Sequence, residues 1–392
     1  MRTLVALTAL VVSSTALFRA CARVPSPGDP IDGLTRAERE RFDRGRVTFE
    51  RVFEPETGLG PLFNAESCVE CHESPAVGGA GDEVEVHVSA FAPDGSFCDP
   101  LVHQGGPVVQ QRVTPALRAA LGIESEPVPA DAERALRTAP DVLGFGLLDA
   151  VPDSTILALA DPNDSDQDGI SGRPNRFFDG RLGRFGRKAL VPTLREFNAG
   201  ALVIEQGITN PLVPTEETIG GAPIPDGVDP VEEPEVDQEA VDRLDDFVRF
   251  LAPPSPRPLT KAAKRGKEVF FEVGCQSCHA PVLVTGNHPV KALRYRKVAA
   301  YTDLLLHDMG PELADICFGE ATPSEFRTEP LMGLRFSEQI AQGKPRFLHD
   351  GRAQTIEEAV RLHGGEATAA RDRFVSLSEA DRAALLAFLR SL

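Results

Sequence analysis

Four stretches of the chain place apolar residues at the spacing of one face of an α-helix, with charged residues on the opposite face. Two of these stretches begin at Leu34-Thr35 and at Leu259-Thr260. In both, the threonine fits an N-cap that precedes a charged first turn. The other two stretches, 247–251 and 385–389, close the first and second halves of the chain. The pattern therefore predicts a mainly α protein in which each half opens and closes with a helix.

A Cys-x-x-Cys-His motif follows the opening helix of each half, at 68–72 and at 275–279. This spacing attaches a c-type haem, because two thiols add to the porphyrin vinyl groups and the histidine binds the iron. A zinc site would need a second pair of ligands near each motif, and a thioredoxin-like pair does not require the histidine. We predict two covalently bound haem c groups, held by Cys68, Cys71, His72, Cys275, Cys278 and His279.

The order of helix, haem motif and closing helix occurs twice, which makes it an internal repeat. A helix before the haem and one at the end, packed together, is the plan of a cytochrome c. We predict two cytochrome c-like domains, 33–254 and 255–392, the first of which carries a large insertion. Within the insertion, residues 211–239 are rich in proline, glycine and acidic residues, which predicts a solvated loop rather than a packed element.

The formal net charge of the 392 residues is −18, and the chain contains no tryptophan. This charge excludes nucleic acid as a natural partner and favours a basic protein or a small ligand. The alternative is that the acidity only keeps the protein soluble. Two haem groups would fill much of the interior that aromatic side chains usually fill.

Residues 1–22 have the pattern of an export signal, with a short positive start and an apolar stretch too short to span a bilayer. Cleavage near Ala20 is one expectation, and lipidation of Cys21 is the alternative, although Arg19 is an unusual neighbour for that signal. No later stretch is long and apolar enough for a transmembrane helix. We therefore predict a periplasmic protein that is either soluble or anchored by a lipid on Cys21.

Two cysteines remain after this assignment, Cys98 and Cys317, one in each half of the chain. In an oxidising compartment they could pair across the two domains. The sequence gives no distance between them, so two unrelated buried thiols are the default interpretation and the pairing stays open.

A calcium loop is indicated by Asp164, Asp166 and Asp168, which alternate before a glycine. Asn175 stands where such a loop usually has a bidentate glutamate, so a turn with solvated aspartates is the alternative. The cations in 172–176 are close by, and they are candidates for binding haem propionates.

Several motifs resemble those of the bacterial di-haem oxidoreductase family, whose members are often described as thiol oxidoreductases. They are Asp-Leu-Leu-Leu-His-Asp-Met-Gly-Pro at 303–311, the stretch 348–367 that opens Leu-His-Asp-Gly-Arg, and the segments 58–64 and 184–189. The family is similar in turn to di-haem cytochrome c peroxidases and to the di-haem enzyme that matures methylamine dehydrogenase.

The resemblance implies a division of labour between the two haems. The C-terminal haem would take electrons from a small soluble donor of the cytochrome c or cupredoxin type. The N-terminal haem would reduce peroxide or a similar small oxidant. The second ligand of the C-terminal haem falls on His363, with Met309 as the alternative. For the N-terminal haem, His87 fits the spacing of a distal ligand better than His103.

A peroxidase also needs a group that moves protons, and Glu205 lies in a stretch that resembles the region carrying it in the peroxidases. A surface glutamate is the alternative. The relatives pass electrons between haems with the help of a tryptophan, which Tyr295, Tyr301 or close haems would replace here. We predict a peroxidase-like di-haem oxidoreductase. A non-catalytic electron-transfer cytochrome is the alternative, a protein-modifying oxidase is a third hypothesis, and thiol oxidation has no support among the residues.

Overall fold

The computed structural model describes residues 24–92, 97–338 and 345–392. The predicted signal peptide at 1–22, with Cys21, lies outside the described residues. Helices make up 33% and strands 14% of the structure. The prediction of a mainly α fold is therefore confirmed only in part, because a sheet that the helical pattern did not predict lies in the first half.

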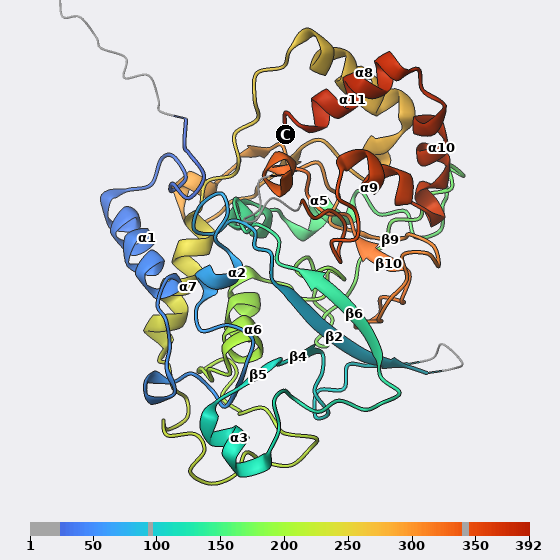
Figure 1. Ribbon diagram of the computed structural model, residues 1–392. Helices are drawn as coiled ribbons and strands as arrows, with labels where there is room; N and C mark the ends of the chain where they lie inside the picture. The colour runs from blue at the N-terminus through green and yellow to red at the C-terminus, as the bar shows by residue number, and fades with distance from the viewer. Residues whose placement is uncertain (1–23, 93–96, 339–344) are drawn as a thin grey trace, which may run out of the picture.

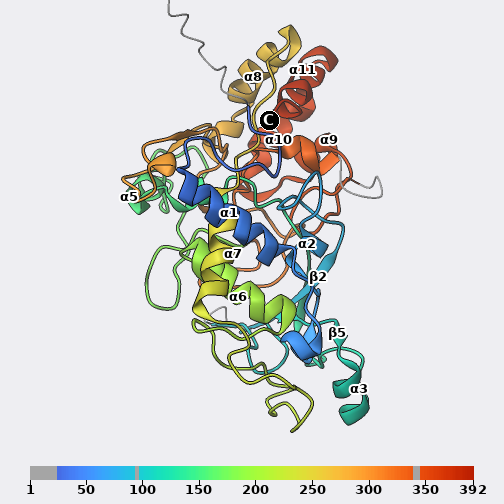
Figure 2. The same cartoon turned by 90° about the vertical axis from the view of Figure 1, so that its left-hand side faces the viewer.

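Two helix pairs correspond to the four amphipathic stretches. Helix α1 (Arg36–Phe49) lies against α7 (Gln238–Phe250), and α8 (Lys261–Val273) lies against α11 (Glu379–Leu389), as Figures 1 and 2 show. The N-caps are those expected from the sequence, because the Thr35 and Thr260 side chains accept hydrogen bonds from backbone N–H groups of the first turn.

A glycine lies at the crossing point of each helix pair. A Cβ atom on Gly45 would lie 2.2 Å from the carbonyl oxygen of Arg243 in α7. A Cβ atom on Gly266 would lie 1.9 Å from the carbonyl oxygen of Ala384 in α11. Both distances are too short for any side chain, so the two glycines allow the backbones to touch. The repeated glycine between basic residues in the sequence thus has a packing cause.

The sheet lies across the middle of the molecule in Figure 1 and comes from the insertion of the first half. Strand β2 (Val84–Phe91) pairs antiparallel with β6 (Glu133–Thr138) over six residue pairs, and with the short strands β4 (Val108–Val109) and β3 (Cys98–Asp99). Valine alternates with polar residues at the start of β2, which is the signal for a half-buried strand.

Apart from α6, which has 13 residues, the remaining elements are short. The other helices are α2 (Cys68–Cys71), α3 (Pro115–Leu121), α4 (Phe145–Asp149), α5 (Asp153–Leu157), α6 (Leu194–Gln206), α9 (Ile356–Leu362) and α10 (Thr368–Ser376). The other strands form three antiparallel pairs, β1 (Leu62–Phe63) with β5 (Arg112–Val113), β7 (Leu283–Val284) with β8 (Lys297–Val298), and β9 (Leu306–Asp308) with β10 (Glu325–Arg327).

Two main clusters of buried apolar residues form the core. The smaller cluster belongs to the second half and contains Phe270 and Phe388 from its helix pair. The larger cluster contains Phe42 and Phe247 from the first pair, but it also takes in Leu293 and Leu305. Residues on both sides of position 255 therefore share one core, and the domain boundaries 33–254 and 255–392 stay a prediction.

The acidic insertion 211–239 has no helix or strand before α7, but it is packed. Val228 is 7% exposed and belongs to a small cluster with Leu62 and Leu117, against which Ile219 and Ile224 also pack. The expectation of a purely solvated loop is wrong in this respect, because the few apolar residues of the stretch find a partner surface.

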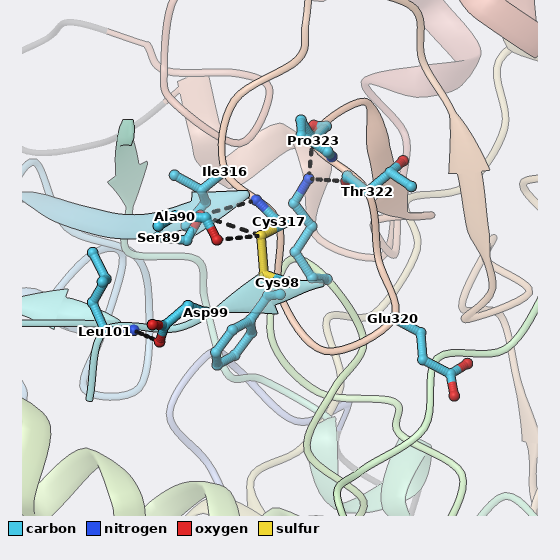
Figure 3. Close-up of a disulfide and its surroundings, with 12 residues drawn as sticks. Ser89, Ala90, Cys98, Asp99, Leu101, Ile316, Cys317, Glu320, Thr322 and Pro323 are labelled. Carbon is cyan, nitrogen blue, oxygen red and sulfur yellow. Dashed lines mark hydrogen bonds between the residues drawn. A yellow bond between two sulfur atoms is a disulfide. The ribbon is translucent and has the colours of Figure 1, made fainter. Parts of the chain in front are cut away.

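A disulfide joins Cys98 of β3 to Cys317, with Cα atoms 5.9 Å apart. Figure 3 shows it between the edge of the sheet and a loop of the second half, beside Ser89. Of the two interpretations that the sequence left open, the structure has the pairing.

Among the helices of the described residues, none has the length and apolar character that crossing a bilayer requires.

Candidate functional site

Each Cys-x-x-Cys-His motif forms one tight turn. In the first motif the N–H of His72 donates to the carbonyl of Cys68 at 3.2 Å, and in the second the N–H of His279 donates to the carbonyl of Cys275 at 2.9 Å. Gly274, with a φ of 94°, ends α8 so that the second motif starts directly after it. The two motifs share this backbone hydrogen bond, although Cys68–Cys71 is α-helical and Cys275–Ser277 is a 3-10 turn.

None of the four motif cysteines forms a disulfide within the described residues. Burial raises the pKa of Cys68 and that of Cys275 to about 12, and it also raises the pKa of Cys71 and of Cys278. Such thiols stay protonated at neutral pH and are poor nucleophiles. A thioredoxin-like redox pair needs a cysteine whose pKa is lowered, so the raised values argue against that interpretation.

The two motif histidines have the same orientation, and it is the orientation that an iron ligand needs. His72 donates its Nδ1–H to the carbonyl of Gly79, and His279 donates its own to the carbonyl of Tyr301, both at 3.0 Å. Burial lowers the pKa of His72 and lowers that of His279 to about 4. Each imidazole is therefore neutral with its Nε2 lone pair free, which is the form that binds a metal.

A cavity of about 280 Å³ lies beside the second motif. Cys275, Cys278 and His279 line it, and most of its other walls are apolar. Ala80 and Pro140 of the first half also reach it. A mainly apolar cavity against two free thiols and a neutral imidazole fits a haem attached at Cys275 and Cys278.

A second histidine with a free Nε2 lines the same cavity. His363 follows α9 directly, and its Nδ1–H donates to the carbonyl of Ala359 at 2.7 Å. Burial lowers its pKa, so it too is a neutral imidazole. Met309 and Met332 line the cavity as well. The structure thus brings His279 together with both ligands predicted for the C-terminal haem, His363 and Met309.

His307 lines the cavity too, but it has no free nitrogen. Its Nε2 lies 2.8 Å from the Asp303 carboxylate and its Nδ1 lies 2.8 Å from the Glu366 carboxylate. Burial opposes the charged form, but the bonds to Asp303, Cys278 and Glu366 outweigh it and raise the pKa of His307 to about 12. A charged imidazole between two carboxylates cannot act as an iron ligand.

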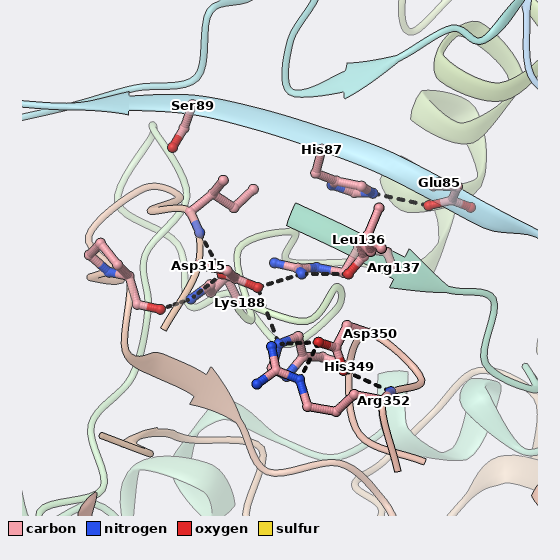
Figure 4. A network of polar contacts seen from close by, with 12 residues as sticks. Glu85, His87, Ser89, Leu136, Arg137, Lys188, Asp315, His349, Asp350 and Arg352 are labelled. Atoms are coloured by element: carbon pink, nitrogen blue, oxygen red, sulfur yellow. Dashed lines mark hydrogen bonds and ion pairs between the residues drawn. The ribbon is translucent and has the colours of Figure 1, made fainter. Parts of the chain in front are cut away.

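His349 belongs to the buried network drawn in Figure 4, where residues of both halves meet at Asp315. Arg137 of β6 donates to its carboxylate at 2.5 Å, and Lys188 lies 3.3 Å from it. From the second half, Nε2 of His349 lies 3.3 Å away, and the His349 ring stacks on Phe326. Burial opposes the charge of Asp315, but these three partners hold its pKa well below the usual range. His349 is thus held in the cavity wall by Asp315 at its Nε2 and by Phe326 on the face of its ring.

Glu205, at the end of α6, lies at the first motif. Its carboxyl group accepts a hydrogen bond from Asn64 Nδ2 at 3.0 Å, and its backbone carbonyl accepts the N–H of Asn64 and of Ala65. Burial and the charge of Glu85 raise the pKa of Glu205 well above its ordinary value. Its own charge acts on the pKa of Cys71. A buried carboxyl group whose pKa is raised therefore lies within electrostatic reach of the first motif.

Strand β2 carries His87, the predicted distal ligand of the N-terminal haem. Its Nε2 lies 3.0 Å from the Glu85 carboxylate on the same face of the strand, and Figure 4 shows the pair below the strand. Glu85 also acts on the pKa of His72 and of Glu205. The pair thus faces the first motif, and iron ligation by His87 stays a prediction. The rejected candidate, His103, is exposed in a loop.

The oxygen atoms of Asp164, Asp166 and Asp168 lie within 4.8 Å of one another. Asn175 does not close this loop, because it is fully buried and its Nδ2 donates to the carbonyls of Lys188 and Phe318. A calcium ion at the three aspartates stays a prediction. A second group of acidic side chains converges within the insertion and consists of Glu216, Asp229, Glu233 and Glu235.

The cations in 172–176 are not among the residues that line the cavity beside the second motif, and their binding of haem propionates stays a prediction. Arg173 pairs with Glu325 at 2.6 Å, and Arg176 donates to the carbonyl of Gly180 at 3.0 Å. The arginines that line the cavity beside the second motif are Arg187, Arg327, Arg346 and Arg371. Sequence reasoning missed them because no local spacing marks an arginine that long-range folding brings to a cavity.

Gln206 at the first motif was also missed. It is 2% exposed, and its Oε1 lies 3.6 Å from Cys68 Sγ. Its position next to Glu205 was the available signal, since the two residues end the same helix.

A family model described as "Di-haem oxidoreductase, putative peroxidase" matches residues 117–392. The match covers more than half of the chain. It includes the second motif, Glu205 and His363, and it begins after the first motif.

Among solved structures, the chain is similar to hydrazine synthase of Kuenenia stuttgartiensis at 14% identity and a TM-score of 0.40, covering 98% of this chain and 100% of that one. It is also similar to a MauG-like protein associated with microbial copper homeostasis, at 16% identity and a TM-score of 0.40, covering 95% and 93%. Neither similarity carries an argument at this TM-score. No curated protein matches the chain.

Proposed function

Because the chain belongs to the di-haem oxidoreductase family, we propose that it is an exported, periplasmic c-type cytochrome with peroxidase-like activity. Electrons would enter from a small soluble donor protein at the C-terminal haem, and peroxide or a similar small oxidant would be reduced at the N-terminal haem. The observation that carries the proposal is the contrast between the motifs. His279 shares its cavity with a second imidazole whose Nε2 is free, whereas the first motif lies beside Glu205, a buried carboxyl group whose pKa is raised.

At the C-terminal site, His279 and His363 would hold the iron of a bound haem, with Met309 as the alternative to His363. Each imidazole is fixed by a backbone carbonyl that accepts its Nδ1–H. Two strong ligands make a site that exchanges electrons without binding a substrate.

At the N-terminal site, haem c when bound supplies an iron that exchanges electrons and, where a coordination position is open, reacts with peroxide. His72 is held in register by its hydrogen bond to Gly79. Glu205 keeps a proton ready because burial and Glu85 disfavour its charged form. Asn64 aims the carboxyl group through its side-chain amide. Such a positioned acid typically contributes on the order of 10²–10⁴-fold to a proton-transfer step.

Two routes of communication between the sites remain from the sequence, a tyrosine relay or direct exchange, because the chain has no tryptophan. Tyr295 is 66% exposed, whereas Tyr301 is 6% exposed and its carbonyl accepts the Nδ1–H of His279. The carbonyl that holds His72 belongs to Gly79, and the next residue, Ala80, lines the cavity of the C-terminal site. The path from the His72 ring to the wall of the C-terminal cavity thus consists of one hydrogen bond to Gly79 and the peptide unit that joins Gly79 to Ala80. So short a path supports direct electron exchange.

Spectra of the protein purified from a host that attaches c-type haem test the proposal. We expect two covalent haems per chain, one low-spin and the other high-spin or responsive to peroxide. Two low-spin haems that ignore peroxide would overturn it in favour of a non-catalytic electron-transfer cytochrome. Fewer than two covalent haems would contradict the assignment of the motifs themselves.

The ligand assignment has its own test. His363→Ala should change the spin state of one haem and leave the peroxide response of the other haem intact. His103→Ala, in an exposed loop, is the matched control and should change neither. An unchanged spectrum of the His363 variant would move the ligand elsewhere, with Met309→Ala as the next variant to measure.

A further inference from the structure

Arg327, at the end of β10, is a buried cation in the wall of the C-terminal cavity. The residue is 5% exposed and lines the cavity together with Arg187. Its Nη2 donates to Glu329 at 2.6 Å, and Nη1 is 3.4 Å from the carbonyl of Arg184. Within the part of the chain that the structure describes, its buried Nε has no hydrogen-bond partner. One donor of a buried guanidinium therefore remains unsatisfied.

The charges around Arg327 do not balance. Arg187 also pairs with Glu329, at 3.0 Å, so two guanidinium groups share one carboxylate. The next carboxyl group in the wall is Asp141. Burial and the charge of Glu329 raise its pKa to about 7, so it supplies only part of a negative charge at neutral pH. A surplus positive charge in a largely apolar cavity is costly unless an anion compensates it.

The anion that fits is a carboxylate. A planar guanidinium binds a carboxylate through paired N–H donors, and Arg is the side chain best suited to this geometry. A porphyrin that is held by thioether links at Cys275 and Cys278 brings two carboxylates of its own into the same cavity, on the edge away from those links. We propose that Arg327, supported by Arg187, binds a propionate of the C-terminal haem. The proposal rests on haem attachment at this motif.

The consequence concerns the reduction potential. A fixed positive charge beside the haem disfavours its ferric form, which carries the additional positive charge. Arg327 therefore raises the potential of the C-terminal haem and helps it to accept electrons from the donor. Glu329 orients both guanidinium groups and so acts as a positioning residue.

The experiment compares Arg327→Gln and Arg327→Lys with wild type by spectroelectrochemistry of the C-terminal haem. Arg327→Gln should shift its one-electron equilibrium at least tenfold toward the ferric form, which corresponds to roughly 59 mV to lower potential. Arg327→Lys keeps the charge and should recover most of the shift. Arg390→Gln, at the surface and paired with Glu338, is the matched control and should not change the potential.

Resonance Raman spectra of the propionate-bending band give a second readout that does not depend on activity. The band should shift in both Arg327 variants, because lysine cannot donate two parallel hydrogen bonds, so Arg327→Lys suffices if Arg327→Gln does not fold. An unchanged potential in Arg327→Gln, or an unchanged band in Arg327→Lys, would overturn the proposal. A wild-type potential that depends on added chloride or phosphate would overturn it too, by assigning the site to a diffusible anion. Loss of covalent haem at the second motif in wild type would instead contradict the proposed function.

Discussion

The two halves of the molecule contain the same Cys-x-x-Cys-His motif, but different residues surround it in each half. In both halves, two helices cross in close contact at a glycine. The motif histidine donates its Nδ1–H to a backbone carbonyl. The second half then places His363 in the cavity of its motif. The first half instead places Glu205, Glu85 and His87 close together, from a helix end and a strand that belong to its insertion. In the proposed function, the repeat would attach the two haems, and the parts outside the repeat would decide what each site does.

The largest expected effect is on the acid of the first half. Glu205→Gln should lower kcat/KM for peroxide by about 10²–10⁴-fold, because the amide cannot supply a proton. The raised pKa of Glu205 also predicts that wild-type turnover falls as the pH rises through that value, since the acid form is then lost. Peroxide turnover with a reduced donor, measured from pH 5 to 10, checks both expectations.

Two controls accompany the Glu205 variant. The electronic spectra of both haems should stay unchanged, and Glu124→Gln, at an exposed glutamate, should keep wild-type turnover. Wild-type turnover in Glu205→Gln would remove the functional difference between the two halves.

The glycine crossings test whether the two halves are structural equivalents. Gly45→Ala and Gly266→Ala should each lower the free energy of unfolding by about 1–3 kcal/mol, because a methyl group would overlap a carbonyl of the facing helix. Gly200→Ala in α6 is the matched control, since nothing lies within 4 Å of its Cβ position. There, alanine should add about 0.5–1 kcal/mol. Denaturant titrations give all three values, and a neutral Gly266→Ala would show that the crossings differ.

The acidic stretch 211–239 should make the stability of the first half fall at alkaline pH. Burial raises the pKa of Glu216 to about 10 and that of Glu235 to about 8. In the unfolded chain both carboxyl groups ionise near their ordinary pKa of about 4.3. Their contribution to stability is therefore complete below that pH and is lost as the pH rises through the folded values.

Melting temperatures from pH 6 to 10, in the presence of a chelator, measure this loss. Glu216→Gln should flatten the dependence, because glutamine does not titrate. Limited proteolysis should show faster cleavage within 211–239 of the wild type at the alkaline end. The same slope in both proteins would assign the pH dependence to other groups.

The smallest expected effect is that of calcium on the aspartate loop. If the site has the affinity of extracellular calcium modules, ~1 mM calcium should stabilise the protein by about 0.4 to 1.4 kcal/mol. Chelation should remove this increment from wild type and not from Asp166→Asn. An equal response of the two proteins would show that Asp164, Asp166 and Asp168 form only a solvated turn.

The sequence predicts those parts of the fold that depend on residues close together in the chain. Thr35 and Thr260 as helix caps and the two haem motifs follow from neighbouring residues. The sheet was missed although β2 alternates, because two of its partner strands are only two residues long. The candidate site divides in the same way. Arg327 and Arg187 line the same cavity although they are 140 positions apart in the chain (327 − 187). No sequence pattern indicates that the fold brings them together.

The bond between Cys98 and Cys317 encloses the insertion and the whole second motif in one covalent ring, since the two cysteines are 219 positions apart. A protease that cuts once within 211–239 opens the ring without releasing either piece. The nicked molecule migrates as a single species on a denaturing gel until a reductant is added. The acidic stretch 211–239 is therefore a place where the chain can be broken while the two fragments, each with one Cys-x-x-Cys-His motif, remain one molecule.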